Sequence, residues 1–113
     1  MSQITDRPVG IVLEESELGG FGGFPDKLCL ISVGGDKYAC NHATLPDGQP
    51  ADGLATFPNP DEATTYMGLL AGLSGTIVAK SFEEAREIAK SKPKLSCLFL
   101  FLGGHIVEIH YIR

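Results

Sequence analysis

The chain lacks several features that would mark a disulfide-rich, secreted or membrane protein. Its 113 residues contain no tryptophan and only three cysteines, and no two of these form a Cys-x-x-Cys pair. An odd number of scattered cysteines argues against a disulfide framework and favours a reducing compartment. No apolar run reaches the ~18 residues of a transmembrane helix, and no basic-then-apolar secretory signal opens the chain. We therefore expect a soluble, cytoplasmic protein with no membrane partner.

Basic residues are also scarce, and they are unevenly distributed. Lysine and arginine total 9 against 14 aspartates and glutamates, which gives a formal net charge of −5. Residues 1–79 hold three basic residues against ten acidic ones, whereas residues 80–113 hold six against four. General nucleic-acid binding requires lysines and arginines that neutralise phosphates. We therefore expect no nucleic-acid partner.

Motifs for nucleotide binding and for a serine nucleophile are missing as well. The glycine-rich segment 19–25 lacks both the Gly-Lys-Ser/Thr ending of a phosphate-binding loop and the Gly-x-Gly-x-x-Gly spacing of a dinucleotide loop. No Gly-x-Ser-x-Gly phrase occurs in the chain. The acidic residues fall on predicted loops and helix starts, where capping explains them. The sequence therefore predicts no cofactor and leaves open whether the chain is an enzyme.

The C-terminal stretch 94–113 is the most informative part of the chain. Leu95 to Leu102 is apolar on both faces of a strand, a pattern typical of a central strand that is covered on both sides. Gly103-Gly104 is typical of a two-residue hairpin turn, because such turns need positive φ. Residues 106–111 alternate better and predict the partner strand. The second predicted helix should cover one face of the central strand.

The predicted turn sets a register that places Cys97 opposite His110. A histidine beside a cysteine favours the thiolate, so this candidate thiol–imidazole pair suits a small thiol-dependent enzyme or a metal site. The alternative is a small apolar cysteine that packs beside a half-exposed histidine. A zinc site needs about four ligands, and no Cys-x-x-Cys phrase supplies an anchor for one. We therefore expect no metal.

The rest of the chain predicts further strands and two helices. Asn59 followed by Pro60 predicts one helix start, and Ser81 with Glu84 forms a capping box that predicts another. The expected strands are 9–13, 28–33, 38–42, 54–57 and 76–79; the expected helices are 60–73 and 82–91; and 43–53 is expected to be a polar connection. Together these predict one α+β domain over residues 1–113. It should have a single mixed, mostly antiparallel sheet of about six or seven strands, with two helices packed on one face.

Two further groups of residues are candidate binding surfaces. Phe21 and Phe24 lie on the glycine-rich segment and form a candidate partner-binding or lid loop, unless they pack back onto the core. A cluster of basic residues near the second helix forms a candidate anion patch, for which the alternative is an ordinary solvated face. Its members are Lys80, Arg86, Lys90, Lys92 and Lys94.

These patterns favour a small, non-enzymatic binding or interaction module that self-associates through its sheet, as a dimer. The reason is the two-faced apolar strand: if no helix reaches its second face, a second protomer should cover it, since large exposed apolar patches are unusual on monomers. The alternative is the small thiol-dependent enzyme or metal site built on Cys97 and His110. No particular small-molecule ligand is indicated.

Overall fold

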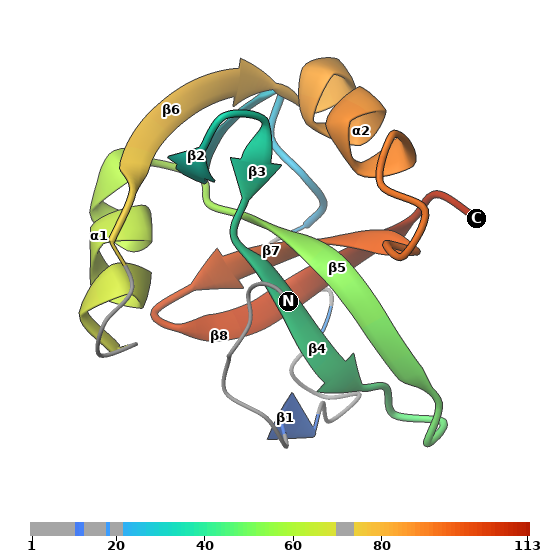
Figure 1. The fold of residues 1–113 in the computed structure, drawn as a ribbon. Helices are drawn as coiled ribbons and strands as arrows, with labels where there is room; N and C mark the ends of the chain where they lie inside the picture. The colour runs from blue at the N-terminus through green and yellow to red at the C-terminus, as the bar shows by residue number, and fades with distance from the viewer. Residues whose placement is uncertain (1–10, 13–17, 19–21, 70–73) are drawn as a thin grey trace.

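The protein is an α+β structure, as the sequence predicts (Figure 1). The computed structural model describes residues 11–12, 18, 22–69 and 74–113. In chain order the elements are β1 (Ile11–Val12), β2 (Lys27–Gly34), β3 (Lys37–Tyr38), β4 (Cys40–Thr44), β5 (Pro50–Thr56), α1 (Pro60–Leu69), β6 (Thr76–Ser81), α2 (Phe82–Lys90), β7 (Cys97–Leu102) and β8 (His105–Tyr111).

Both helices begin at the residues that the capping signals predict. Asn59 Oδ1 accepts the backbone N–H of Glu62 at 3.0 Å at the start of α1. Ser81 and Glu84 form the predicted reciprocal capping box at the start of α2. These side chains satisfy N–H groups that have no partner within the helix. Neither helix in the described part of the chain has the length and apolar character needed to cross a membrane.

The strands form two sheets, which corrects the prediction of a single one. One sheet has the order β1-β4-β5-β7-β8, with β1 adding only two residues beside β4. The other is antiparallel, with the order β3-β2-β6. Ala39, between β3 and β4, joins them: its N–H bonds to Ile31 O at 2.9 Å in the small sheet, and its carbonyl accepts from Ala55 N–H at 3.1 Å in the large one. The predicted strand 38–42 is thus divided between two sheets.

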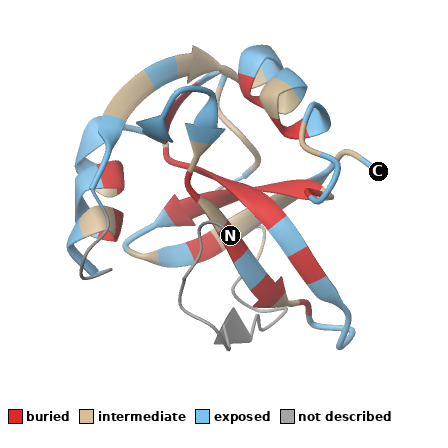
Figure 2. Ribbon diagram, in the orientation of Figure 1, coloured by how far each residue is buried: buried red, intermediate tan, exposed pale blue. Residues whose placement is uncertain are grey.

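The two helices cover opposite faces of β7, so the prediction that both pack on one face is wrong. Side chains alternate across a strand. Cys97, Phe99 and Phe101 enter a core that includes residues of α1, whereas Leu98 and Leu100 enter a second core that includes residues of α2. Because both faces of β7 are apolar, each needs its own cover, and the chain supplies both (Figures 1 and 2). The prediction that α2 covers one face of this central strand is confirmed.

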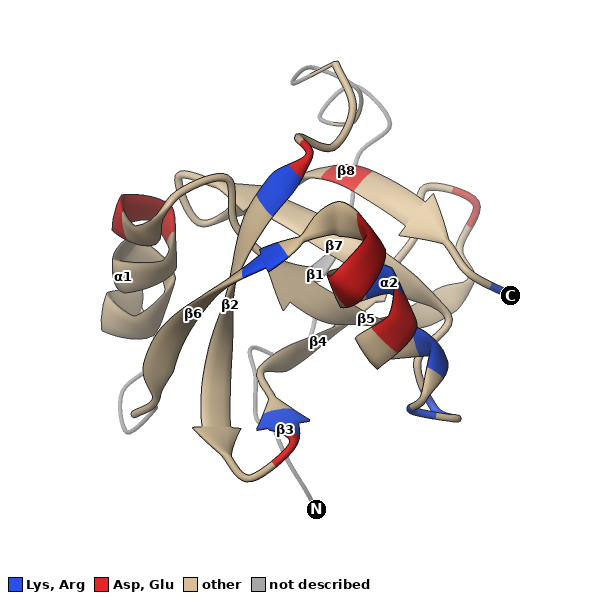
Figure 3. Ribbon diagram, turned by 90° about the horizontal axis from the view of Figure 1, so that it is seen from above, with Lys and Arg blue, Asp and Glu red and all other residues tan. Residues whose placement is uncertain are grey.

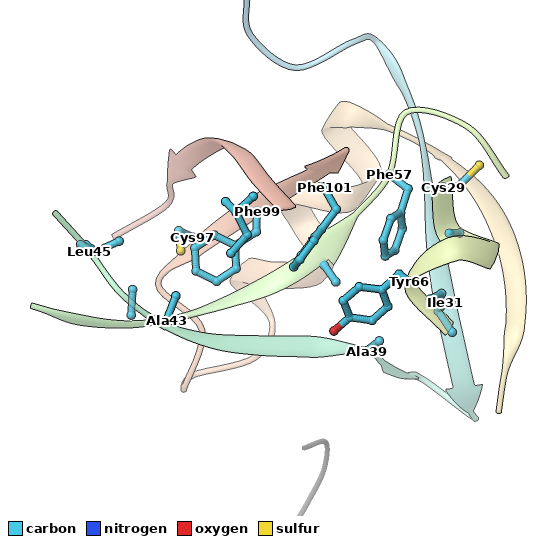
Figure 4. Close-up of a cluster of buried hydrophobic side chains, with 14 residues drawn as sticks. Cys29, Ile31, Ala39, Ala43, Leu45, Phe57, Tyr66, Cys97, Phe99 and Phe101 are labelled. Atoms are coloured by element: carbon cyan, nitrogen blue, oxygen red, sulfur yellow. The ribbon is translucent and has the colours of Figure 1, made fainter. Parts of the chain in front are cut away.

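Aromatic rings fill much of the core beneath α1 (Figure 4). Phe57 stacks on Phe101 with ring centroids 5.6 Å apart, and Tyr66 of α1 contacts both rings, at 5.1 and 4.8 Å. Tyr66 also accepts a hydrogen bond from Asn41 Nδ2 at 2.8 Å through its hydroxyl group. These contacts fix α1 to the large sheet and keep the first core out of water.

The predicted polar connection 43–53 is instead most of a β-hairpin. β4 pairs with β5 in an antiparallel register that places Ala43 opposite Ala51, and both alanines are buried. His42 and Asp52 face each other on the solvent side, with Nδ1 and Oδ1 2.7 Å apart. The polar composition thus reflects one exposed face of a hairpin, because polar and small apolar residues alternate along it.

Candidate functional site

The predicted Cys97–His110 pair does not form, although the hairpin and its Gly103-Gly104 turn do. Next to the turn the register is as predicted, with Phe101 opposite Ile106. A β-bulge then leaves Val107 without a partner and shifts the rest of the ladder by one residue. Leu98 therefore faces His110 and Cys97 faces Tyr111. A shift of one residue moves side chains to the other face of a sheet, so Cys97 and His110 lie on opposite faces.

The thiols do not have the environment of a nucleophile. Cys97 is fully buried, and its Sγ donates to the backbone carbonyl of Asp52 at 3.7 Å. Burial raises the pKa of Cys97 to about 12 and that of Cys40 to about 11. Since the thiolate is the nucleophile and the metal ligand, both thiols stay protonated and inert at neutral pH. Nowhere in the described ranges do three or more His, Cys, Asp or Glu side chains gather as metal ligands.

His110 lies instead in an aromatic cluster on the α2 side of the sheet. Its ring is 5.0 Å from Phe82 and 6.1 Å from Phe24, centroid to centroid, and both pairs meet edge to face. Its Nε2 atom is buried and, among the described residues, has no hydrogen-bond partner. Phe24 therefore packs onto the protein at this point, while Phe21 lies outside the described residues. The structure thus brings one of the two candidate loop phenylalanines, Phe24, to His110.

Glu108 fixes the chain that leads into Phe24. Its Oε2 atom accepts the backbone N–H groups of Gly22 and Gly23, each at 3.0 Å. Both glycines have positive φ, 87° and 110°, a conformation that glycine adopts at no steric cost. The carboxylate of Glu108 is thus a structural anchor for this segment.

The five candidate basic residues lie in α2 and on either side of it. Lys80 precedes α2, whereas Lys92 and Lys94 follow it, and a nine-residue helix is about 13 Å long. Lys92 Nζ donates to the backbone carbonyl of Asp36 at 2.6 Å and lies 3.8 Å from its carboxylate. The acidic residues Glu83 and Glu84 lie in the first turn of α2, after Lys80 (Figure 3). Arg86 and Lys90 lie within the helix, so the residues of the candidate anion patch are spread along the length of α2, and the patch stays a prediction.

The most regular exposed feature is the outer edge of β6. β1 and β3 are two-residue edge strands, and β8 is interrupted by its bulge. β6 is six residues long and pairs with β2 in an unbroken register, from Thr76 opposite Ser32 to Ser81 opposite Lys27. Within the described ranges no strand lies on its far side, where β6 forms the rim of the small sheet (Figure 1).

The hydrogen bonds of β2 show which groups of β6 point toward this edge. Cys29 exchanges two backbone hydrogen bonds with Phe57, at 2.8 and 2.9 Å, and Ile31 O accepts from Ala39 N–H. Because β6 occupies the other side of β2, the N–H and C=O groups of Cys29 and Ile31 point away from β6. In an antiparallel ladder, hydrogen-bonded and non-hydrogen-bonded pairs alternate. The pairs that these two residues form with β6 are therefore the non-hydrogen-bonded ones.

Within the described ranges, this alternation leaves the backbone groups of two residues of β6 without a neighbouring strand. Ala79 faces Cys29 and Ile77 faces Ile31, so the N–H and C=O groups of Ala79 and Ile77 point outward, away from β2. The next outward residue is Ser81, and its N–H is bonded to the carboxylate of Glu84 at 2.9 Å, which agrees with this alternation. Ile77 and Ala79 thus present two donors and two acceptors at an otherwise regular strand edge.

Sequence reasoning missed this edge, although it predicted a strand over 76–79. The order of strands in a sheet is set by tertiary contacts, and no local signal in these residues marks an edge. Comparison of the chain with protein-family models, curated proteins and solved structures gives no match.

Proposed function

We propose that the chain is a non-catalytic interaction module that binds an extended polypeptide strand along the outer edge of β6. In this mode of recognition a peptide adds a strand to an open sheet: main-chain hydrogen bonds give affinity and alternate side chains give specificity. The observation that carries the proposal is that no strand of the described residues pairs with the outward backbone groups of Ile77 and Ala79, on a strand whose register with β2 is unbroken.

The chemistry of the edge supports such a partner. An incoming strand would use two donors and two acceptors, and each hydrogen bond contributes a net ~0.5–1.5 kcal/mol. Ile77 and Val78 are half-buried and lie on opposite faces of the strand, so each offers apolar contact to a side chain of the added strand. Lys80 is the one charged residue of β6, and it stands near one end of the strand.

Two other observations favour the edge over the alternatives. Both faces of β7 are already covered by the chain's own helices, which removes the reason to expect association through a sheet face. The raised pKa values of Cys40 and Cys97 leave little thiolate for covalent chemistry at neutral pH. Association through the sheet, if it takes place, would therefore use hydrogen bonds at a strand edge.

Peptide selection tests the proposal without assuming a natural partner. Random extended peptides displayed on phage are selected against the immobilised protein, and the enriched peptides are measured by fluorescence anisotropy. Ala79→Pro removes an outward N–H at an edge position where proline is tolerated, and the matched control Ala79→Ser keeps it. We expect enriched peptides to lose about tenfold or more in affinity for Ala79→Pro, the effect of about one or two lost hydrogen bonds, and to bind Ala79→Ser like the wild type. Equal binding to all three proteins would contradict the proposal.

A further inference from the structure

We infer that the strand added to β6 is β6 of a second copy of the chain, in a two-fold dimer whose axis passes beside Val78. This inference rests on the proposed function, because it names the partner of the same edge. Two identical strands related by a two-fold axis must run antiparallel, and the same patch serves both subunits. The two small sheets then join as one sheet of six strands, with β6 and its copy at the centre.

The free backbone groups of the edge are complementary to themselves in one register. Hydrogen-bonded pairs across an antiparallel ladder must join outward-pointing residues of both strands. With Ile77 opposite the partner's Ala79, symmetry places Ala79 opposite the partner's Ile77. All four outward N–H groups and all four outward C=O groups of these residues are then bonded.

Neighbouring registers leave groups unsatisfied. Moving the axis one residue toward the C-terminus places Ile77 opposite the partner's Ser81, whose N–H is already bonded to Glu84. It also brings the two Lys80 residues within about 7 Å along the strands, at 3.3 Å per residue. Moving the axis one residue the other way places Ala79 opposite the partner's Gly75, which lies before the start of β6 at Thr76. The register centred on Val78 is the one that uses the free groups fully.

Charge and side-chain size also suit this register. Val78 faces the partner's Val78 across a non-hydrogen-bonded pair, which brings two half-buried β-branched side chains together on the α2 face. Lys80 lies opposite the partner's Thr76, so the two lysines are about 13 Å apart along the strands, beyond the ~10 Å Debye length at 0.1 M salt. β6 contains no acidic residue, although the chain carries a net charge of −5. The centre of the interface is thus free of like-charge contacts.

Disulfide trapping tests the register. Val78→Cys places two thiols across a non-hydrogen-bonded pair, where Cα atoms are ~4.5 Å apart, within the ~4.4–6.8 Å that a disulfide spans. The matched variants Ile77→Cys and Ala79→Cys place the new thiols on a diagonal of about 7–8 Å. The wild-type protein, with its three native cysteines, is the background control. Each protein is oxidised mildly, and the covalent dimer is measured on non-reducing gels and by analytical ultracentrifugation.

We expect Val78→Cys to give a covalent dimer at least about tenfold faster than the two neighbouring variants, because its thiols lie closer together. A tenfold ratio corresponds to a free-energy difference of about 1.4 kcal/mol. Adding Ala79→Pro to Val78→Cys should abolish that dimer. Faster trapping of Ile77→Cys or Ala79→Cys would overturn the register. A monomer at all concentrations, with peptide binding that Ala79→Pro still weakens, would overturn the inference and leave the proposed function standing. A monomer whose affinity for the peptides is unchanged by Ala79→Pro would overturn both the inference and the proposed function.

Discussion

The ring of Phe99 lies directly over the backbone of Gly53. A Cβ atom added at Gly53 would stand 2.7 Å from Cδ2 and Cε2 of Phe99 and 2.9 Å from Sγ of Cys97. Gly53 is therefore a glycine for reasons of space: β5 and β7 are parallel neighbours here, and the ring fills the place of the missing side chain.

Gly53→Ala should destabilise the protein by about 1–3 kcal/mol, the usual cost of forcing an extra carbon into a packed core. The matched control is Gly68→Ala in α1, where nothing lies within 4 Å of the added atom. Alanine is the better helix former, so this control should stabilise by up to ~1 kcal/mol. Urea unfolding of both variants measures the difference, and equal stabilities would contradict the packing described at Gly53.

Phe99→Ala should cost about 3–5 kcal/mol, because the ring is 0% exposed and its removal leaves a cavity. Tyr111→Ala, on the neighbouring strand, removes a ring that is 55% exposed and should cost far less. The midpoints of denaturant unfolding curves, compared at constant m-value, measure the loss of stability in both variants. A loss below roughly 1 kcal/mol for Phe99→Ala would show that the ring is not buried.

Glu108→Gln should loosen the segment that leads into Phe24. The substitution removes the negative charge of the carboxylate that accepts hydrogen bonds from the N–H groups of Gly22 and Gly23. Hydrogen bonds to a charged group contribute about 1.5–3 kcal/mol when they are shielded from water. We expect faster amide exchange at both glycines and a smaller loss of global stability. Glu87→Gln, at an exposed position in α2, is the control. Unchanged exchange at both glycines would show that the carboxylate does not hold this segment.

Alkaline pH should reveal the buried thiols. The pKa of Cys97 rises from its ordinary value of 9.0 to about 12 on folding, and that of Cys40 rises to about 11. Between pH 9.0 and about 12, the Cys97 thiol is deprotonated in the unfolded chain but still protonated in the folded protein. Burial of this thiol therefore contributes fully to the free energy of unfolding below pH 9.0, and that contribution is lost as pH rises toward about 12. Thermal unfolding from pH 7 to 10 should show a steeper alkaline decline in the wild type than in Cys97→Ala; equal slopes would contradict the raised pKa.

Features that depend only on residues close together in the sequence were predictable. The Gly103-Gly104 turn and the Ser81–Glu84 capping box are local, and both form as their sequence signals indicate. The register beyond the turn was not predictable, because the bulge lies between two residues, Ile106 and Glu108, that no local turn signal separates. The bulge places Ile109 rather than Glu108 opposite Phe99 of the first core, and the same shift separates Cys97 from His110.

Tertiary arrangement decided what local patterns could not. Two apolar faces on β7 are compatible with a helix on each side or with one helix and a partner, and the sequence alone does not choose between them. The chain places α1 on the second face, so the surface expected to form a dimer became core. The edge of β6 emerges only from strand order and from the hydrogen bonds that Cys29 and Ile31 make on the other side of β2.

Amide hydrogen exchange of the unmodified protein tests the open β6 edge most directly. In dilute solution the amides of Ile77 and Ala79 should exchange rapidly, while those of Val78 and Lys80, which point toward β2, should be protected. Raising the protein concentration should slow exchange at Ile77 and Ala79 and leave Val78 and Lys80 unchanged. Protection of Ile77 and Ala79 that is already complete in dilute monomer, or rapid exchange at Val78 and Lys80 instead, would contradict the free edge on which the account depends.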